Sequence, residues 1–472
     1  MCIRDRNFQY VRASNSTASS GSAQNTEPDR GLGAFIFTNQ SAITIENCQF
    51  QYGVDGFFGQ VIYSTNSTTE LLHIKNSRFA NGGNARNLFY TDAQEVIIEH
   101  CVFEELEKDR DGSDALDLFN SSVDLKFKNN VFFNNKALRI NTAGGSKEDN
   151  NNSGTINIEI ENVLGFNNTL SEATYAKGLV YVRSDDLSSG QQNINLSITN
   201  SSFINNVGDG ESIIYIYDDD GPFCCDNFNV TMHNNVFYGN KVSENSEILY
   251  DVLTKKEEAN KEIVDVLISG SHNATDKNDS KLITNSDYND GAIDLSSASS
   301  LTDLFVGTTD TEGNFDAKGT DDEWFTEDDG FVPKGNGVLH NVGHNDAVAD
   351  INADIKGHKR VQETTVDIGA YERGTAELTL EVEGLSSISE LILYPNPIRS
   401  SQKGTSLLGY VTGSSSKPTR LVLRDLSGKL VRDLSIEDSG KGIDLGVLPS
   451  ATYLAILSTE KEGYKSFKLV VE

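Results

Sequence analysis

The chain has 472 residues, 37% of them hydrophobic, and a formal net charge of −31. That length suits two or three domains, or one elongated repeat domain with a smaller module. Because so acidic a surface repels phosphate groups, nucleic acid and anionic membranes are excluded as partners, and uronic-acid polymers are repelled unless a basic spot or a cation intervenes.

The N-terminal sequence Met-Cys-Ile-Arg-Asp-Arg lacks the apolar core of a signal peptide. No run in the chain approaches the roughly 18 apolar residues of a membrane-spanning helix. Since the other end of the chain argues for export, as shown below, we expect the native start to be missing. We interpret residues 1–30 as a disordered or non-native segment.

A strand motif recurs through the first half of the chain. It reads aliphatic, any, aliphatic, any, Asn, small, any, Phe. A period of two predicts short strands, and a drifting repeat of roughly 30 residues predicts a solenoid. A degraded eighth copy starts at Val266. The aromatic residues that close the seven clear copies, the fifth with one residue inserted, are Phe50, Phe79, Phe103, Phe132, Phe166, Phe203 and Phe237.

The motif also predicts how successive coils stack. Asn tolerates a left-handed backbone at a corner, and its amide can bond the same Asn one coil away. Coils spaced about 4.8 Å apart place Phe on Phe. Cys48 and Cys101 then lie two coils apart with Ser77 between them, beyond disulfide reach, so we expect both to be buried and reduced. Adjacent Cys224 and Cys225 leave a vicinal disulfide open.

Over roughly residues 31–275 this pattern resembles the right-handed parallel β-helix superfamily, whose members include pectate lyases and many bacterial surface proteins. The resemblance implies an all-β fold, with a right-handed parallel β-helix solenoid as the main domain. It implies no single function, because one fold hosts many activities.

A second strand precedes each motif. When these strands are aligned by eye, one position is mostly tyrosine, and it would form a ladder of tyrosines if it faces outward. Aromatic rings stack on sugar rings, so its five tyrosines are candidate carbohydrate-binding residues. Exposed tyrosines are also common on solenoid strands without any ligand. The column reads Tyr63, Tyr90, Asp117, Arg139, Tyr181, Tyr215 and Tyr250.

The Asp–Arg step in this column suggests a second possibility. In β-helix polysaccharide lyases the cleft resembles this arrangement. A lyase needs a base for the proton α to a carboxyl group, and a cation that stabilises the enolate. Asp117, Arg139 and Arg183 are therefore candidate catalytic residues, although Asp117 and Arg139 are equally explained as a neighbour ion pair.

Residues 276–373 lose the repeat and are acidic and rich in loops. Closely spaced carboxylates with glycine turns can cage calcium, and a solvated acidic loop is the alternative. The segment closes with Val-Asp-Ile-Gly-Ala-Tyr-Glu, which resembles the ending of bacterial β-helix surface proteins of the choice-of-anchor type. We expect it to cap the open end of the solenoid, followed by a linker at 374–390. The candidate calcium ligands are Asp316, Asp321, Asp322, Asp328 and Asp329.

Residues 391–472 predict a small antiparallel β-sandwich of about seven strands. They contain Tyr-Pro-Asn-Pro, an Asp-Leu-Ser-Gly-Lys hairpin, a Leu-Pro and Thr-Tyr strand and a basic, apolar end. In this order the parts resemble the type A sorting domain of the type IX secretion system of Bacteroidota, with a generic immunoglobulin-like module as the alternative. The resemblance implies export by that machinery, to the outer-membrane surface or the medium.

Together these features predict a secreted or cell-surface β-helix protein that binds an extracellular polysaccharide, a surface glycan or another surface partner. The alternative is an enzyme, either a polysaccharide lyase or a glycoside hydrolase, and the sequence leaves that choice open. Calcium is the one cofactor considered.

Overall fold

In the computed structural model the chain forms two compact units, residues 1–378 and 379–472. The residues that the structure describes are 2–4, 7–9, 36–38, 42–51, 54–59, 62–64, 70–80, 83–85, 87–91, 93–106, 114–118, 123–135, 140–144, 154–169, 178–184, 192–208, 212–218, 227–243, 246–247, 250–256, 266–277, 290–310, 312–374, 391–394, 407–412, 418–425, 430–436, 443–445, 448–449, 451–459 and 464–471.

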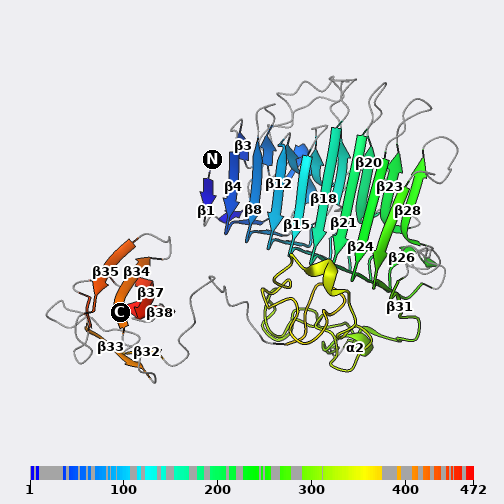
Figure 1. Ribbon diagram of the computed structural model, residues 1–472. Helices are drawn as coiled ribbons and strands as arrows, with labels where there is room; N and C mark the ends of the chain where they lie inside the picture. The colour runs from blue at the N-terminus through cyan, green and yellow to red at the C-terminus, as the bar shows by residue number, and fades with distance from the viewer. Residues whose placement is uncertain are drawn as a thin grey trace. The chain divides into compact units, whose positions relative to one another are not determined.

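Two long parallel sheets run along the first unit (Figure 1). In spatial order the described strands of sheet I are β1 (Cys2–Arg4), β4 (Ala42–Glu46), β8 (Leu71–Lys75), β12 (Glu95–Glu99), β15 (Val123–Lys128), β18 (Gly154–Glu161), β21 (Gln192–Thr199), β24 (Asn227–His233) and β29 (Val266–Ser271). Those of sheet II are β2 (Asn7–Gln9), β5 (Gln49–Gln51), β9 (Arg78–Ala80), β13 (Val102–Glu104), β16 (Val131–Phe133), β19 (Leu164–Phe166), β22 (Ser202–Ile204), β25 (Val236–Tyr238), β30 (Ala274–Thr275) and β31 (Ile293–Asp294).

Sheet III closes the coils in two parallel runs. One holds β3 (Ile36–Thr38), β7 (Ile62–Ser64), β11 (Asn87–Thr91) and β14 (Asp114–Leu118), and the other β17 (Ile140–Gly144), β20 (Val180–Ser184), β23 (Ser212–Asp218) and β28 (Tyr250–Lys256). Two small pairs accompany them, β6 (Val54–Gly59) with β10 (Gly83–Ala85) and β26 (Lys241–Ser243) with β27 (Ser246–Glu247). Since each coil from β1 to β28 adds one strand to each sheet in chain order, the predicted β-helix solenoid is confirmed.

The corner between sheets I and II has a left-handed backbone in coil after coil, which confirms the role predicted for the motif Asn. Only residues that tolerate positive φ fit there, and Asn is the commonest such residue after Gly. A second left-handed position follows five residues later at several coils, and the sequence reading missed it. The first-corner residues have φ between 47° and 56° and are Asn47, Asn76, His100, Asn129, Asn162, Asn200, Asn234 and His272.

Amide ladders tie neighbouring coils together, but mostly one residue beyond the predicted position. Among the corner residues, Asn162 Nδ2 donates to Asn129 Oδ1 at 2.8 Å. The longer ladder starts after the second corner, where each buried amide oxygen accepts the backbone N–H of the preceding coil. Because these amides lie in the interior, they satisfy backbone groups that water cannot reach. Its members are Asn135, Asn168, Asn206 and Asn240.

Phenylalanines stack inside the first coils as predicted. Ring centroids of Phe50 and Phe79 lie 4.9 Å apart, and those of Phe79 and Phe103 lie 5.0 Å apart. The prediction that Phe166 closes the fifth copy of the motif was wrong, because the fifth copy has no inserted residue. Gly165 takes the inward position between Phe132 and Phe203, while Phe166 pairs with Phe133 on the outer side.

The cysteine prediction is confirmed for the two residues that the structure describes. Cys48 and Cys101 are buried thiols outside any disulfide. Ser77 lies between them, and its Oγ accepts the N–H of Cys48 at 3.1 Å. Cys224 and Cys225 lie outside the described residues.

Residues 290–374 pack along the outer side of sheet II. Outward residues of that sheet, such as Val131 and Phe166, share one buried cluster with Phe331, Leu339 and Tyr371 of the segment. The segment contains α2 (Leu301–Leu304) and the 3₁₀ helix η3 (Asn345–Val348). The sequence predicted that this segment caps the open end of the solenoid. Within the described residues, only β31 of the segment extends a sheet at that end, by pairing with β30.

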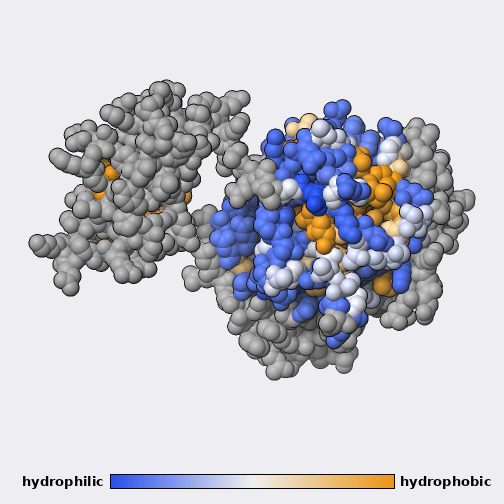
Figure 2. Space-filling model, turned by 90° about the horizontal axis from the view of Figure 1, so that it is seen from below, coloured by the Kyte–Doolittle hydropathy of each residue, from blue (hydrophilic) through white to orange (hydrophobic). Residues whose placement is uncertain are grey.

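This lateral placement follows from the sheet itself. Sheet II carries apolar residues on its outward face, and such a face is stable only when another part of the chain covers it. Seen from below, the coloured surface of the first unit is largely hydrophilic and is interrupted by a hydrophobic patch (Figure 2). The exposed large hydrophobic residues described in this unit are Val306, Val338 and Val342.

The second unit is the antiparallel sandwich that the sequence predicted. A buried cluster that includes Leu421, Ile443, Leu457 and Leu469 forms its core. The described strands of one sheet are β32 (Leu391–Tyr394), β33 (Leu407–Thr412) and β36 (Ile443–Asp444), and those of the other are β35 (Leu430–Ser435), β34 (Pro418–Asp425), β37 (Ala451–Thr459) and β38 (Tyr464–Val471). Among the described residues, no helix has the length and apolarity that crossing a membrane requires.

Candidate functional site

A pocket of about 500 Å³ lies between the first coils and a loop of the packed segment. Its size falls in the range of roughly 300–1,000 Å³ that is usual for small-molecule sites. One wall consists of the corner residues and first sheet II residues of three successive coils, and the other of residues 318–325. The lining residues are Asn47, Cys48, Gln49, Asn76, Ser77, Arg78, His100, Val102, Lys318, Asp322, Glu323, Trp324 and Phe325.

Glu104 fastens the loop to the coils behind this pocket. It is the last residue of β13 and is 2% exposed. Its Oε1 binds the guanidinium of Arg78. Its Oε2 lies 3.2 Å from Lys318 Nζ and accepts a hydrogen bond of 3.4 Å from Trp324 Nε1. Because a buried carboxylate needs such partners, its two cations and the indole are held in fixed positions.

Aromatic rings support the same loop. The Trp324 ring meets the Phe133 ring edge to face, with centroids 5.2 Å apart. Phe325 lies against the His100 ring at 6.0 Å. Burial lowers the pKa of His100, so its imidazole is neutral near pH 7. The pocket therefore combines neutral rings and two cations with amide groups.

The amides of the pocket come from the repeat itself. Asn47, Asn76 and Gln49 are exposed at the corners and strand starts of the first two coils. The left-handed backbone at Asn47 and Asn76 turns the chain from sheet I into sheet II. Fixed amide donors and acceptors next to aromatic rings are well suited to hydroxyl-rich, partly apolar ligands.

The tyrosine column differs in part from the alignment. Tyr63, Tyr90 and Asp117 are in register on β7, β11 and β14, as expected. Tyr181 and Tyr215 are also in register, with ring centroids 5.8 Å apart, but they are 4% and 3% exposed. An open face is therefore wrong for these two residues.

The alignment was also wrong about the neighbours of this pair. Asn141, rather than Arg139, pairs with Tyr181. Leu253, rather than Tyr250, pairs with Tyr215. The loops before these strands differ in length, so matching aromatic residues by eye misplaced the register. Carbohydrate binding by the tyrosines stays a prediction.

The candidate catalytic residues are not brought together by any described contact. Asp117 lies on β14, and Arg183 on β20 pairs with Ala143 and Tyr217. Arg139 lies outside the described residues. Their role as an acid–base pair stays a prediction.

Three of the candidate calcium ligands, Asp321, Asp322 and Asp328, use their carboxylates within the loop. Asp328 accepts hydrogen bonds from the N–H and the hydroxyl of Thr320 at 2.6 and 2.7 Å, and these bonds hold its pKa well below the ordinary value. Asp322 pairs with Lys318 at 3.4 Å. Across the described residues, which include all five acids, no three His, Cys, Asp or Glu side chains group as a metal site.

Asp329 differs from the other four acids because it is fully buried. Its Oδ2 accepts hydrogen bonds from the Phe325 N–H at 3.0 Å and the Tyr371 hydroxyl at 2.9 Å. Burial raises its pKa to about 7. This residue fastens the loop from inside and does not face the pocket.

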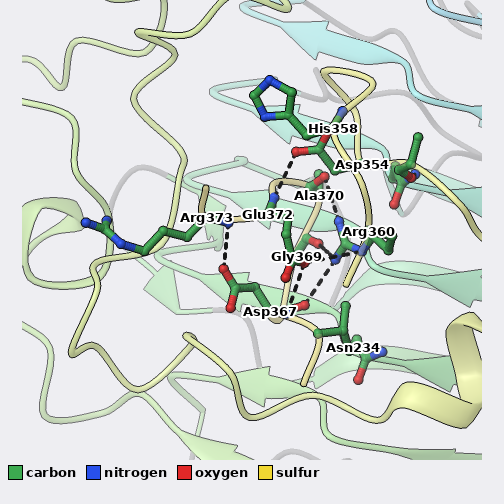
Figure 3. Close-up of polar contacts among 12 residues, drawn as sticks. Asn234, Asp354, His358, Arg360, Asp367, Gly369, Ala370, Glu372 and Arg373 are labelled. Atoms are coloured by element: carbon green, nitrogen blue, oxygen red, sulfur yellow. Dashed lines mark hydrogen bonds and ion pairs between the residues drawn. The ribbon is translucent and has the colours of Figure 1, made fainter. Parts of the chain in front are cut away.

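The closing motif of the segment forms a second polar cluster around Arg360 (Figure 3). The guanidinium donates to the carbonyl oxygens of Asp367, Gly369 and Ala370 at 3.0, 2.6 and 3.0 Å. Its Nε lies 3.8 Å from Glu372 Oε2. One buried side chain therefore holds the whole turn.

Three buried carboxyl groups complete this cluster. Asp354 accepts the N–H groups of His358 and Glu372 at 2.8 and 2.9 Å, and Asp367 accepts that of Arg373 at 2.8 Å. Burial raises the pKa of Asp354 and Asp367, and that of Glu372 to about 8. All three are at most 1% exposed, so the cluster fastens the segment and meets no ligand.

The fold and these contacts define a parallel β-helix protein with a laterally packed segment and a separate sandwich unit. Searches against protein-family models, curated proteins and solved structures found no match.

Sequence reasoning missed the pocket because residues 318–325 of one wall follow residues 47–102 of the other by more than 200 residues. Two signals were present. Arg78 occupies a motif position where other copies carry unlike residues, and Trp324 is the only tryptophan of the chain. Neither signal shows that the two residues meet at Glu104.

Proposed function

We propose that this chain is a secreted or cell-surface protein that binds an extracellular polysaccharide in the pocket between its first coils and residues 318–325. The observation that carries the proposal is the combination of exposed amides, a buried ion-pair centre and aromatic rings around one cavity.

The arrangement of the pocket supports a saccharide ligand. Sugars present hydroxyl groups that need paired donors and acceptors, which amides provide in fixed geometry. They also present apolar C–H faces that rest on aromatic rings. The walls repeat coil by coil at about 4.8 Å, so a chain of sugar units can follow the solenoid axis past successive corners.

The charges around the pocket also support this choice. Arg78 and Lys318 are paired with Glu104, and Asp322 and Glu323 are exposed at the rim. Within the lining residues the opposite charges therefore nearly cancel, in a chain with a net charge of −31. A neutral saccharide approaches such a pocket without the repulsion that the chain exerts on polyanions.

Export rests on the resemblance of residues 391–472 to type A sorting domains. The antiparallel sandwich of that unit is compatible with it. The proposal therefore places the β-helix outside the cell, where polysaccharides are available, with the type IX secretion machinery as the partner of the second unit.

The test is retention of the full chain on a panel of immobilised neutral and acidic polysaccharides, with and without calcium. Soluble fractions are assayed for new reducing ends and for unsaturated products. Retention without cleavage supports the proposal, whereas cleavage of any polymer shows that the enzyme alternative is correct. Absence of both retention and cleavage contradicts both.

Two glutamine variants locate the site. Gln49→Ala removes an exposed amide of the pocket, and loss of one neutral hydrogen bond weakens binding about three- to tenfold. Gln94→Ala changes an exposed glutamine that is not among the lining residues and serves as the matched control. Equal weakening by both variants would contradict binding in the pocket.

A further inference from the structure

The pocket belongs to the site already described, and outside it the strongest cluster of titratable groups is formed by three histidines. His233 ends β24, His272 turns the corner after β29, and His344 belongs to the packed segment. The His344 ring centroid lies 5.6 Å from that of His233 and 5.3 Å from that of His272. The cluster therefore bridges the last coils and the segment.

Ser271 connects two of these imidazoles. Its hydroxyl lies 2.9 Å from Nδ1 of His233 and 2.9 Å from Nδ1 of His344, and the residue is 4% exposed. A hydroxyl has one proton, so it donates to one imidazole and accepts from the other. Two neutral imidazoles of opposite tautomer satisfy this geometry fully.

Asn234 holds the backbone of the segment at the same place. Its Oδ1 accepts the N–H of His344 at 2.7 Å, and its Nδ2 donates to the carbonyl oxygen of His344 at 3.2 Å. The neighbouring N–H of Gly343 donates to Val366 at 2.8 Å. The two Asn234 bonds break if residues 341–345 move away from the coils, whereas the Gly343 bond lies within the segment.

The charged groups around the cluster are few among the described residues. From the segment, Asp346 lies 3.9 Å from Nε2 of His344 and is largely exposed. From the stretch before β31, Asp290 raises the pKa of His272, although burial and the neighbouring His344 lower it overall. From the coils, the residues in register with His233 are Thr199 and Ser271, which are neutral.

We propose that the three histidines and Ser271 form an acid-opened latch, which releases residues 341–345 from the last coils when the imidazoles become protonated. Protonation places like charges about 5.5 Å apart in a partly buried cluster, where they repel one another. It also removes the neutral tautomers that share the Ser271 hydroxyl.

The direction of the effect follows from the pKa values. Burial and the neighbouring imidazoles lower the pKa of His233 and of His272 below the ordinary value of 6.5. The closed form therefore binds fewer protons than the open form, so the latch is stable above pH 6.5 and loses stability below it. With two protons taken up on opening, the opening constant rises up to about 100-fold per pH unit.

The experiment is amide hydrogen exchange of the full chain between pH 7.5 and 5.5, corrected for intrinsic exchange rates. The N–H of His344, which donates to Asn234 of the coils, reports the latch. The N–H of Arg360, which donates to Asn352 at 2.9 Å, is the control in the same segment. We expect the opening constant at His344 to rise by up to about 30-fold between pH 6.5 and 5.5, with little change at Arg360.

Two variants separate the latch from general acid loosening. His272→Asn keeps the corner, because six of the other first-corner residues are Asn and one is His. It should reduce the rise to about fivefold at most, and adding His233→Gln should reduce it below threefold. An equal rise at Arg360, or an unchanged rise in the double variant, would overturn the proposal.

Discussion

The buried amide ladder gives the sharpest stability prediction. Asn168 has no exposed surface. Its Oδ1 accepts two hydrogen bonds from Asn135, one from the backbone N–H at 3.1 Å and one from Nδ2 at 2.9 Å. Its Nδ2 donates two, one to the carbonyl oxygen of Phe132 at 2.9 Å and one to Asn206 Oδ1 at 2.9 Å. Replacement by Ala removes all four side-chain bonds.

The magnitude follows from the groups left without partners. The Asn135 N–H and the Phe132 carbonyl become unpaired in the interior, at about 1–3 kcal/mol each. Asn135 Nδ2 keeps its bond to Phe103, and Asn206 Oδ1 keeps the Asn168 N–H. We therefore expect Asn168→Ala to lower the free energy of unfolding of the β-helix by about 2–6 kcal/mol.

The assay is denaturant unfolding followed by Trp324 fluorescence. Trp324 is the only tryptophan and packs on Phe133, so the signal reports the first unit alone. The matched control is Asn195→Ala, which removes exposed bonds such as the 2.8 Å bond to Asn157 and should cost under about 1 kcal/mol. Equal effects of the two variants would refute the argument that burial makes the ladder strong.

Three further predictions concern single buried positions. Gly165→Ala should cost about 1–3 kcal/mol, because an added Cβ would lie 2.8 Å from Leu179 Cδ2, and Leu179→Ala should reduce that penalty in denaturant unfolding. Burial raises the pKa of Cys101 to about 12, so alkylation at pH 8 should label its thiol in denaturant and leave it unlabelled in the folded protein. The pKa of Asp329 in the folded protein is about 7, above its ordinary value of 3.8, so its contribution to stability is lost as pH rises through 7. Asp329→Asn should therefore stabilise the protein at pH 8 by up to about 4 kcal/mol and have little effect at pH 4, measured as the shift of the unfolding midpoint.

The repeat determined the β-helix because it is a local rule applied many times. Alternate aliphatics define an inward face, and Asn at each corner supplies the left-handed backbone that the turn requires. The stacking of Phe50, Phe79 and Phe103 and the reduced state of Cys48 and Cys101 follow from the same register. The misassignment of Phe166 shows the limit, because two adjacent aromatic positions, one inward and one outward, look alike in sequence.

The pocket, the buried Arg360 cluster and the histidine latch were decided by tertiary structure. Each joins the coils to residues 290–374, or distant parts of that segment to one another, without any periodic pattern. The sequence shows that this segment is acidic and lacks the repeat, which suits an end cap as well as a lateral cover. The apolar outer face of sheet II selected the lateral position, because such a face is stable only when another part of the chain covers it.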